Sequence, residues 1–168
     1  MNNTKALGVD IGNVIIDYRP IIGTKDETLW NEKHSDLLPA ENMFDCLKEL
    51  NEGKFKDSIF LVSKLKVEQD SRTLAWLKDN KFFEKTGINP KNMFFCRERS
   101  DKEKICRENG ITHFVDDRLE VLSYMIGVVP NLYLYQPDEE EVRQFKQFLP
   151  KVIRVTDWLD LTKRLIVD

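Results

Sequence analysis

The sequence predicts an α/β protein: a doubly wound, mainly parallel sheet of five to six strands with helices on both faces. Short runs of consecutive apolar residues recur along the chain, and such runs are typical of strands that are buried on both faces of a parallel sheet. Segments with helical spacing separate these runs, as expected when a helix carries the chain from one parallel strand to the next. The length of 168 residues suits a single domain with a substantial core, and we expect one domain over residues 1–168.

The apolar runs place the predicted strands. They span residues 7–10, 58–63, 92–96, 111–115, 131–135 and 152–155. Helices are predicted at residues 40–52, 68–85, 100–109, 119–126 and 138–148, and a closing helix around Trp158 and Leu161. Ser100 with Glu103 forms a capping-box pattern at the start of its helix, and Thr156 is the expected cap of the closing helix. Residues 18–39 are polar and irregular, which indicates a flap-like excursion with at most a short helix near residues 27–33.

The stretch LGVDIGNVIID, residues 7–17, is central to the prediction. A buried strand that ends at Asp10 would put a carboxylate at the carboxyl end of a parallel strand, where open α/β sheets bind ligands. Gly12-Asn13 between apolar residues is equally a signal for a hairpin turn. The stretch alone leaves both interpretations open, and its partners further along the chain decide between them.

Composition narrows the class of protein. The formal net charge is −3, so nothing in the global balance indicates nucleic acid or an anionic membrane as a partner. The sequence shows neither a signal peptide nor an apolar run that could span a bilayer. Its three cysteines are odd in number and lack CxxC spacing, which favours reduced thiols and a cytoplasmic location. An oligomer is compatible with the sequence.

Polar side chains follow three of the predicted strands. Asp10 follows the first, Ser63 ends the second, and the pair Asp116-Asp117 follows the fourth. If these strands are parallel, their carboxyl ends meet in one crevice and the side chains gather there. Carboxylate oxygens are the ligands that Mg²⁺ prefers, and a hydroxyl can donate a hydrogen bond to a phosphoryl oxygen.

A lysine completes this set. Lys102, with Lys104 as the alternative, lies in the first turn of the predicted helix 100–109, where a cation opposes the helix dipole. A single lysine at such a position is usually a solvated surface residue. Together with the carboxylates and Ser63, however, a cation matches what phosphoryl transfer requires.

This ordered set resembles the haloacid dehalogenase (HAD) superfamily over residues 7–129. The segment GVDIGNVIID is similar to the DxGN-type openings of some of its phosphatases and of epoxide-hydrolase-like members. The segment DKEKICRENGITHFVDDR resembles the third and fourth motifs of the 5′-deoxyribonucleotidase branch. The resemblance implies a three-layer Rossmann-like HAD fold, here with a minimal cap formed by residues 18–39.

The resemblance also implies roles for single residues. Asp10 would be the nucleophile that forms an aspartyl phosphate, and it would also ligate Mg²⁺. The backbone carbonyl of Gly12 and the carboxylate of Asp117 would be further metal ligands, with Asp116 assisting. Catalytic roles would fall to Asp10, Ser63 and Lys102, and substrate contacts to Gly12, Asn13, Ser63, Lys64 and Lys102.

One position departs from the superfamily pattern. The usual phosphatase has an aspartate two residues after the nucleophile, as general acid and base, and here that position is Gly12. Because such help is typically worth about 10²–10⁴ in rate, we expect a slow enzyme, or one restricted to good leaving groups. Asp17 is a nearby carboxylate that could substitute.

A Mg²⁺-dependent phosphatase that acts on a small phosphorylated molecule is therefore the first expectation. A catalytically impaired HAD-like protein that only binds its ligand is the alternative. A dehalogenase would not need the acidic pair, and an actin-like sugar kinase would need two domains, more than 168 residues supply. Tyr18, Arg19 and Trp30 are the expected contacts from the flap.

Overall fold

The computed structural model describes residues 4–19 and 36–167, with residues 67–70 described by their backbone only. The described residues form one six-stranded sheet in the order β3-β2-β1-β4-β5-β6, and every pairing in it is parallel. The strands are β1 (Leu7–Val9), β2 (Ile59–Lys64), β3 (Met93–Cys96), β4 (His113–Asp116), β5 (Asn131–Tyr135) and β6 (Ile153–Val155). This confirms the predicted fold class.

The strand order places a reversal at the centre of the sheet. From β1 the chain moves outward through β2 to β3, then returns to the other side of β1 and continues through β4 and β5 to β6. In open parallel sheets, ligands bind outside the carboxyl ends of the strands at the point where the order reverses. That point here lies between β1 and β4.

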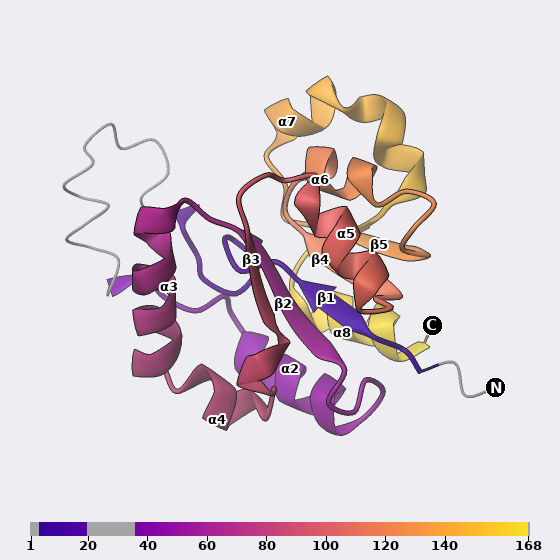
Figure 1. Ribbon diagram of the computed structural model, residues 1–168. Helices are drawn as coiled ribbons and strands as arrows, with labels where there is room; N and C mark the ends of the chain where they lie inside the picture. Colours follow the sequence, from indigo (N-terminus) through magenta and orange to yellow (C-terminus); the bar gives the residue numbers. More distant parts are fainter. Residues whose placement is uncertain (1–3, 20–35, 168) are drawn as a thin grey trace.

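Helices cover both faces of the sheet (Figure 1). They are α2 (Met43–Glu52), α3 (Val67–Asp79), α4 (Phe82–Thr86), α5 (Asp101–Glu108), α6 (Leu119–Tyr124), α7 (Glu139–Gln144) and α8 (Trp158–Val167), with 3-10 helices η3 (Pro90–Asn92) and η4 (Lys146–Lys151). The core that contains Leu7 and Val9 of β1 joins α2, α3, α4 and α8, and the core that contains Phe114 of β4 joins α5, α6 and α7. The result is a three-layer sandwich.

The long helix predicted at residues 68–85 is wrong in one respect, because the structure divides it into α3 and α4. Lys81 lies between them in the left-handed region, with φ 53°, and its N–H donates to the carbonyl of Lys78 at 2.9 Å. The resulting turn redirects the chain, so that Phe82 enters the core with 0% exposure. The free energy gained by burying this ring exceeds the cost of interrupting the helix that the sequence pattern predicts.

Two predicted caps are also corrected. The Ser100 side chain makes no capping hydrogen bond, since this residue already has helical dihedrals (φ −64°, ψ −24°). The closing helix begins at Trp158, and Asp157 caps it: its Oδ1 accepts a hydrogen bond from the Asp160 N–H at 2.8 Å. The predicted cap, Thr156, therefore lies one residue before the residue that caps the helix.

The predicted helix 138–148 is shorter than expected. Asp138 caps α7 by accepting hydrogen bonds from the N–H groups of Glu140 and Glu141, and the chain then tightens into η4, which contains Pro150. The predicted helix at residues 27–33, Trp30 and most of the flap lie outside the described residues. In the described part of the chain, no helix combines the length and the apolar character needed to cross a bilayer.

Candidate active site

Three carboxylates meet at the centre of the sheet. Asp10 directly follows β1, Asp116 ends β4, and Asp117 comes next, while the Asp10 N–H donates to the Val115 carbonyl at 3.0 Å. Because β1 and β4 are neighbours, one oxygen from each of the three aspartates lies within 4.8 Å of the others. Residues more than a hundred positions apart in sequence are thereby brought together, as the parallel-strand argument predicts.

The Gly12-Asn13 turn does not form a hairpin with β1, since β1 pairs only with β2 and β4 among the described strands. Asn13 adopts a left-handed conformation (φ 61°), and its N–H donates to the Ile16 carbonyl at 2.8 Å. Its side chain donates to Asp117 Oδ2 at 2.9 Å and accepts from the Tyr18 N–H at 3.2 Å. Asn13 therefore holds Asp117 in position, in addition to the substrate contact that is predicted for it.

Lys102, not Lys104, belongs to this cluster. It is 2% exposed, and its Nζ donates to Asp10 Oδ1 at 2.8 Å and to Asp116 Oδ2 at 2.7 Å. Lys104 is exposed and pairs with Glu108 at 3.8 Å. The attraction of Lys102 to these two carboxylates outweighs its repulsion by the positive end of the helix dipole, which explains a lysine at this position.

Burial and nearby charges perturb the titration of Asp10, Asp117 and Lys102. Burial raises the pKa of Asp10 to about 6, with Asp116 adding to the rise and Lys102 opposing it. Burial and the charges of Asp116 and Asp10 raise the pKa of Asp117 well above its ordinary value, against the hydrogen bond from Asn13. Burial alone would lower the pKa of Lys102, yet its two carboxylate partners raise it, so the ammonium stays charged. One ammonium thus faces three carboxylates, which leaves a surplus of negative charge.

The donor set fits a hard divalent cation. Mg²⁺ takes oxygen ligands at about 2.0–2.1 Å, so two ligands of one ion lie up to about 4 Å apart. Asp116 is already engaged at both oxygens, by Lys102 and by the Arg118 N–H at 3.0 Å. No hydrogen bond from the described residues reaches Asp117 Oδ1, so Asp10 and Asp117 would be the main ligands.

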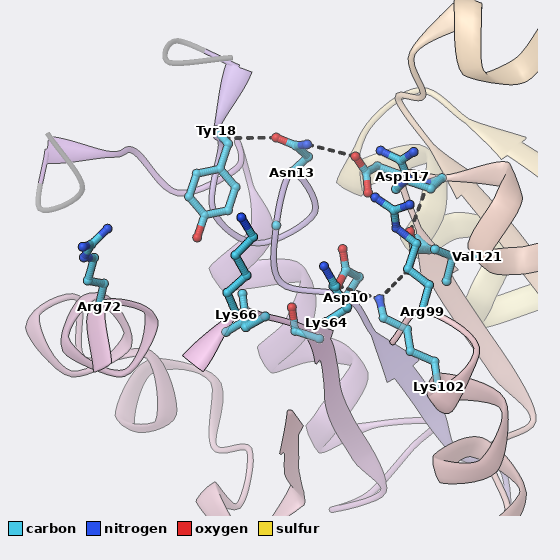
Figure 2. A pocket seen from close by; sticks show the side chains of 15 residues that line it. Asp10, Asn13, Tyr18, Lys64, Lys66, Arg72, Arg99, Lys102, Asp117 and Val121 are labelled. Atoms are coloured by element: carbon cyan, nitrogen blue, oxygen red, sulfur yellow. Dashed lines mark hydrogen bonds and ion pairs between the residues drawn. The ribbon is translucent and has the colours of Figure 1, made fainter. Parts of the chain in front are cut away.

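These residues line a pocket of about 470 Å³. Its lining does not include the expected flap contact Arg19, but it contains every residue to which the resemblance assigns a role: Asp10, Gly12, Asn13, Ser63, Lys64, Lys102, Asp116 and Asp117. Figure 2 shows Asp10 and Lys102 at the base of the pocket and Asp117 on one side. Ser63 is 2% exposed and comes from β2, next to β1.

Tyr18 occupies the space beside Gly12. A Cβ atom at position 12 would lie 3.1 Å from Tyr18 Cε2, closer than an ordinary van der Waals contact, so this ring packs tightly against the position. Tyr18 is 8% exposed and burial raises its pKa to about 12. Asp17 does not line the pocket; it forms an ion pair with Arg19 at 2.6 Å, and this contact lowers the pKa of Asp17. The expected Asp17 substitution for a general acid is not supported by this geometry.

Sequence reasoning missed much of the pocket wall. Leu65, Lys66, Arg72, Arg99, Arg118 and Val121 also line it. Arg118 follows the acidic pair directly, and Lys66 lies just beyond the end of β2, so proximity to strand ends was an available signal. Arg72 lies on α3, and no spacing in the sequence relates it to the strand ends.

No known family model matches the sequence, and no curated protein matches it either. Solved structures do share its fold. A haloacid dehalogenase-like hydrolase from Burkholderia xenovorans matches with a TM-score of 0.66 and 12% identity, over 94% of each chain. A haloacid dehalogenase-like hydrolase from Streptococcus pneumoniae matches with a TM-score of 0.64 and 8% identity, over 98% of this chain and 100% of the other.

A third structure, of D,D-heptose 1,7-bisphosphate phosphatase from B. bronchiseptica with magnesium and phosphate, has a TM-score of 0.62 and 12% identity. The match covers 97% of this chain and 98% of the phosphatase. The chain therefore has the fold of HAD-like hydrolases, a group that includes a phosphatase.

Proposed function

We propose that this protein is a Mg²⁺-dependent phosphatase of the HAD superfamily that hydrolyses phosphoric monoesters through an aspartyl phosphate on Asp10. One observation carries the proposal: Asp10, Asp116 and Asp117 gather within 4.8 Å beside a buried lysine that bridges two of them. The fold of the solved neighbours supports the same class of reaction.

Each residue has a defined part in this proposal. The Asp10 carboxylate attacks phosphorus as the bond to the leaving oxygen breaks, and water then cleaves the aspartyl phosphate to regenerate the carboxylate. Lys102 holds Asp10 in its ionised form and stabilises charge on the phosphoryl oxygens, to which Ser63 donates a hydrogen bond. Asp10, Asp117 and the Gly12 carbonyl would hold Mg²⁺, with Asp116 assisting, and the bound ion would neutralise the phosphoryl charge.

We expect this enzyme to be slow with alkyl phosphates. Gly12 offers no side chain to protonate the leaving oxygen, and the Tyr18 ring lies against this position. General acid catalysis contributes about 10²–10⁴ in rate, and a leaving group of low basicity does not need it. Acyl and aryl phosphates are therefore the expected best substrates.

The test compares turnover of p-nitrophenyl phosphate and acetyl phosphate by the wild-type protein and by Asp10→Asn, each with Mg²⁺ and with EDTA. Wild-type protein with Mg²⁺ should turn over both compounds, and Asp10→Asn should fall to background. Asp17→Asn is the matched control, because it makes the same change outside the pocket. Background rates for all three proteins would instead favour a HAD-like protein that only binds its ligand.

The finer assignments belong to the same proposal. A DxGN-type site is supported by the position of Gly12 and Asn13 beside Asp10, and the resemblance to 5′-deoxyribonucleotidases rests on the segment around Lys102 and Asp116-Asp117. A small phosphorylated molecule suits the pocket of about 470 Å³. A minimal cap and a cytoplasmic location complete the proposal.

A further inference from the structure

Each carboxylate among the described residues of the pocket already has a function other than proton transfer. These carboxylates belong to Asp10, Asp116 and Asp117. Asp10 is the proposed nucleophile, and Asp117 would be a ligand of the metal ion. Both oxygens of Asp116 accept hydrogen bonds, from Lys102 Nζ at 2.7 Å and from the Arg118 N–H at 3.0 Å.

The other described side chains of the pocket do not supply a general base. The basic side chains only donate hydrogen bonds, and the hydroxyl groups of Ser63 and Tyr18 hold their protons at neutral pH. Gly12 contributes no side chain. Asp17 lies outside the pocket, where its two oxygens accept hydrogen bonds from the Arg19 guanidinium at 2.6 Å and 2.9 Å. The described part of the site is therefore built for a nucleophile but not for deprotonating water.

This arrangement affects the two halves of the proposed reaction differently. When Asp10 attacks an acyl or aryl phosphate, the bond from phosphorus to the leaving oxygen breaks, and a carboxylate or phenolate departs as a stable anion that needs no proton. Water, in contrast, must lose a proton as it attacks the aspartyl phosphate, and general base catalysis of such a step is worth about 10²–10⁴ in rate. The aspartyl phosphate should therefore form faster than it is hydrolysed.

A carboxylate acceptor avoids this obstacle. Because it is ionised at neutral pH, it attacks phosphorus with its own electron pair, the bond from phosphorus to Asp10 breaks, and Asp10 becomes a carboxylate again without any proton transfer. Donor and product are both anhydrides of a carboxylic and a phosphoric acid, so the transfer is close to isoenergetic and runs in either direction. The pocket of about 470 Å³ lies within the size range of small-molecule sites.

We infer that Asp10 is a phosphoryl carrier between carboxylates: it takes the phosphoryl group from an acyl phosphate and returns it to a carboxylate acceptor faster than to water. This inference rests on the proposed function for the identity of the nucleophile. It goes beyond that function because it assigns a phosphotransferase activity, with acyl phosphates as donors and carboxylates as acceptors.

The test begins with wild-type protein and Mg²⁺. p-Nitrophenyl phosphate should release about one equivalent of p-nitrophenolate in a burst, followed by a steady phase that is about 100-fold slower or more. Mass spectrometry of the quenched intact protein should find one added phosphoryl group, which Asp10→Asn should lack. With acetyl phosphate as donor, radiolabelled acetate should enter acetyl phosphate faster than inorganic phosphate is released.

Gly12→Asp supplies a proton acceptor and should raise the steady rate toward the burst rate, so that hydrolysis gains on acetate exchange. The φ of Gly12 lies outside the left-handed region, so the added side chain is limited by the Tyr18 ring, 3.1 Å from the new Cβ, rather than by the backbone. Gly12→Asn is the matched control, because it has the same size but accepts no proton, and it should not raise the steady rate.

The wild-type measurements separate this inference from the phosphatase proposal. Turnover in a single phase, with neither a phosphorylated protein nor acetate exchange, would overturn the inference and leave the phosphatase proposal standing. A phosphorylated protein that exchanges no acetate would also contradict the carrier. If wild-type protein showed neither turnover nor phosphorylation, both proposals would be wrong.

Discussion

Lys102 sets the charge balance of the pocket. Its ammonium lies between Asp10 and Asp116 with 2% exposure, and both of its partners are buried. A buried ion pair often adds little net stability, whereas removal of one partner leaves an uncompensated charge in the interior. The two carboxylates therefore depend on Lys102 in the absence of a metal ion.

Lys102→Met should lower the free energy of unfolding by about 3–5 kcal/mol at pH 7.5, as measured by urea denaturation in EDTA. The loss should be smaller at pH 5, where Asp10, with its pKa raised to about 6, is mostly protonated. Lys104→Met is the control and should change stability by no more than about 0.5 kcal/mol. Similar losses for both variants at pH 7.5 would contradict this account of Lys102.

Single residues also show how far the sequence could predict the site. Asp10, Asp116 and Asp117 were predictable because each lies at or directly after the end of a strand, and a parallel sheet brings strand ends to one edge. The position of the Tyr18 ring beside Gly12 was not predictable, since it depends on how the turn after Asp10 returns toward the pocket. Arg72 was missed for a related reason, as its helix reaches the pocket only through tertiary packing.

Helix α6 is held in place by a side chain from another helix. Glu141 of α7 is 8% exposed, and its carboxylate accepts hydrogen bonds from the Leu119 N–H at 3.1 Å and the Glu120 N–H at 2.8 Å. These N–H groups belong to the first turn of α6, where no intrahelical acceptor exists. Because Arg118 occupies the N-cap position of α6 and follows Asp117 directly, Glu141 indirectly positions the acidic pair.

Glu141→Ala should destabilise the protein by about 1–3 kcal/mol, since it leaves two backbone donors unsatisfied at the start of α6. Glu141→Gln keeps one amide oxygen as an acceptor and should cost less. Thermal or urea unfolding measures both changes. Glu140→Ala is the control from the same helix, because Glu140 is exposed and pairs with Arg143 on the surface. An equal loss in Glu140→Ala would show that α7 itself, rather than the contact with α6, is responsible.

The strands and the helices differ in how well the sequence predicts them. All six predicted strands are present. The central ones are marked by apolar runs because they are buried on both faces, whereas the edge strand β6 is mostly exposed and includes Arg154. The sequence did not predict the break at Lys81 or the cap at Asp157. Both depend on how a helix packs against a neighbouring helix or strand. Helix ends are set by tertiary packing as much as by local capping residues.

The acidic cluster affects the stability of the whole molecule. The ordinary pKa of an aspartate is 3.8, and burial raises that of Asp10 to about 6. The folded state therefore binds more protons than the unfolded state between these values, and the raised pKa of Asp117 acts in the same direction, so stability in EDTA should fall as the pH rises through this window. A divalent cation would offset this cost, since it needs the ionised carboxylates.

At pH 7.5, a Mg²⁺ concentration about 100 times its Kd should raise the midpoint of thermal unfolding by about 5–10 °C relative to EDTA. The increase should shrink at pH 5, because protonation of Asp10 competes with the metal ion. Differential scanning calorimetry at constant ionic strength measures it, and Asp117→Asn should abolish it. A shift that is unchanged at pH 5, or that persists in Asp117→Asn, would place the stabilising ion elsewhere on the protein.

The position of β1 between β2 and β4 has a consequence for biosynthesis. The partner of Leu7–Val9 on one side is His113–Asp116, so a nascent chain must expose more than a hundred residues before the two strands can pair. Such distant pairing slows folding, because the intervening polypeptide loses entropy before the contact is made. An emerging amino-terminal fragment would hold Asp10 without Asp116 and Asp117. The ion-binding chemistry is therefore expected to arise late, when β4 docks onto β1.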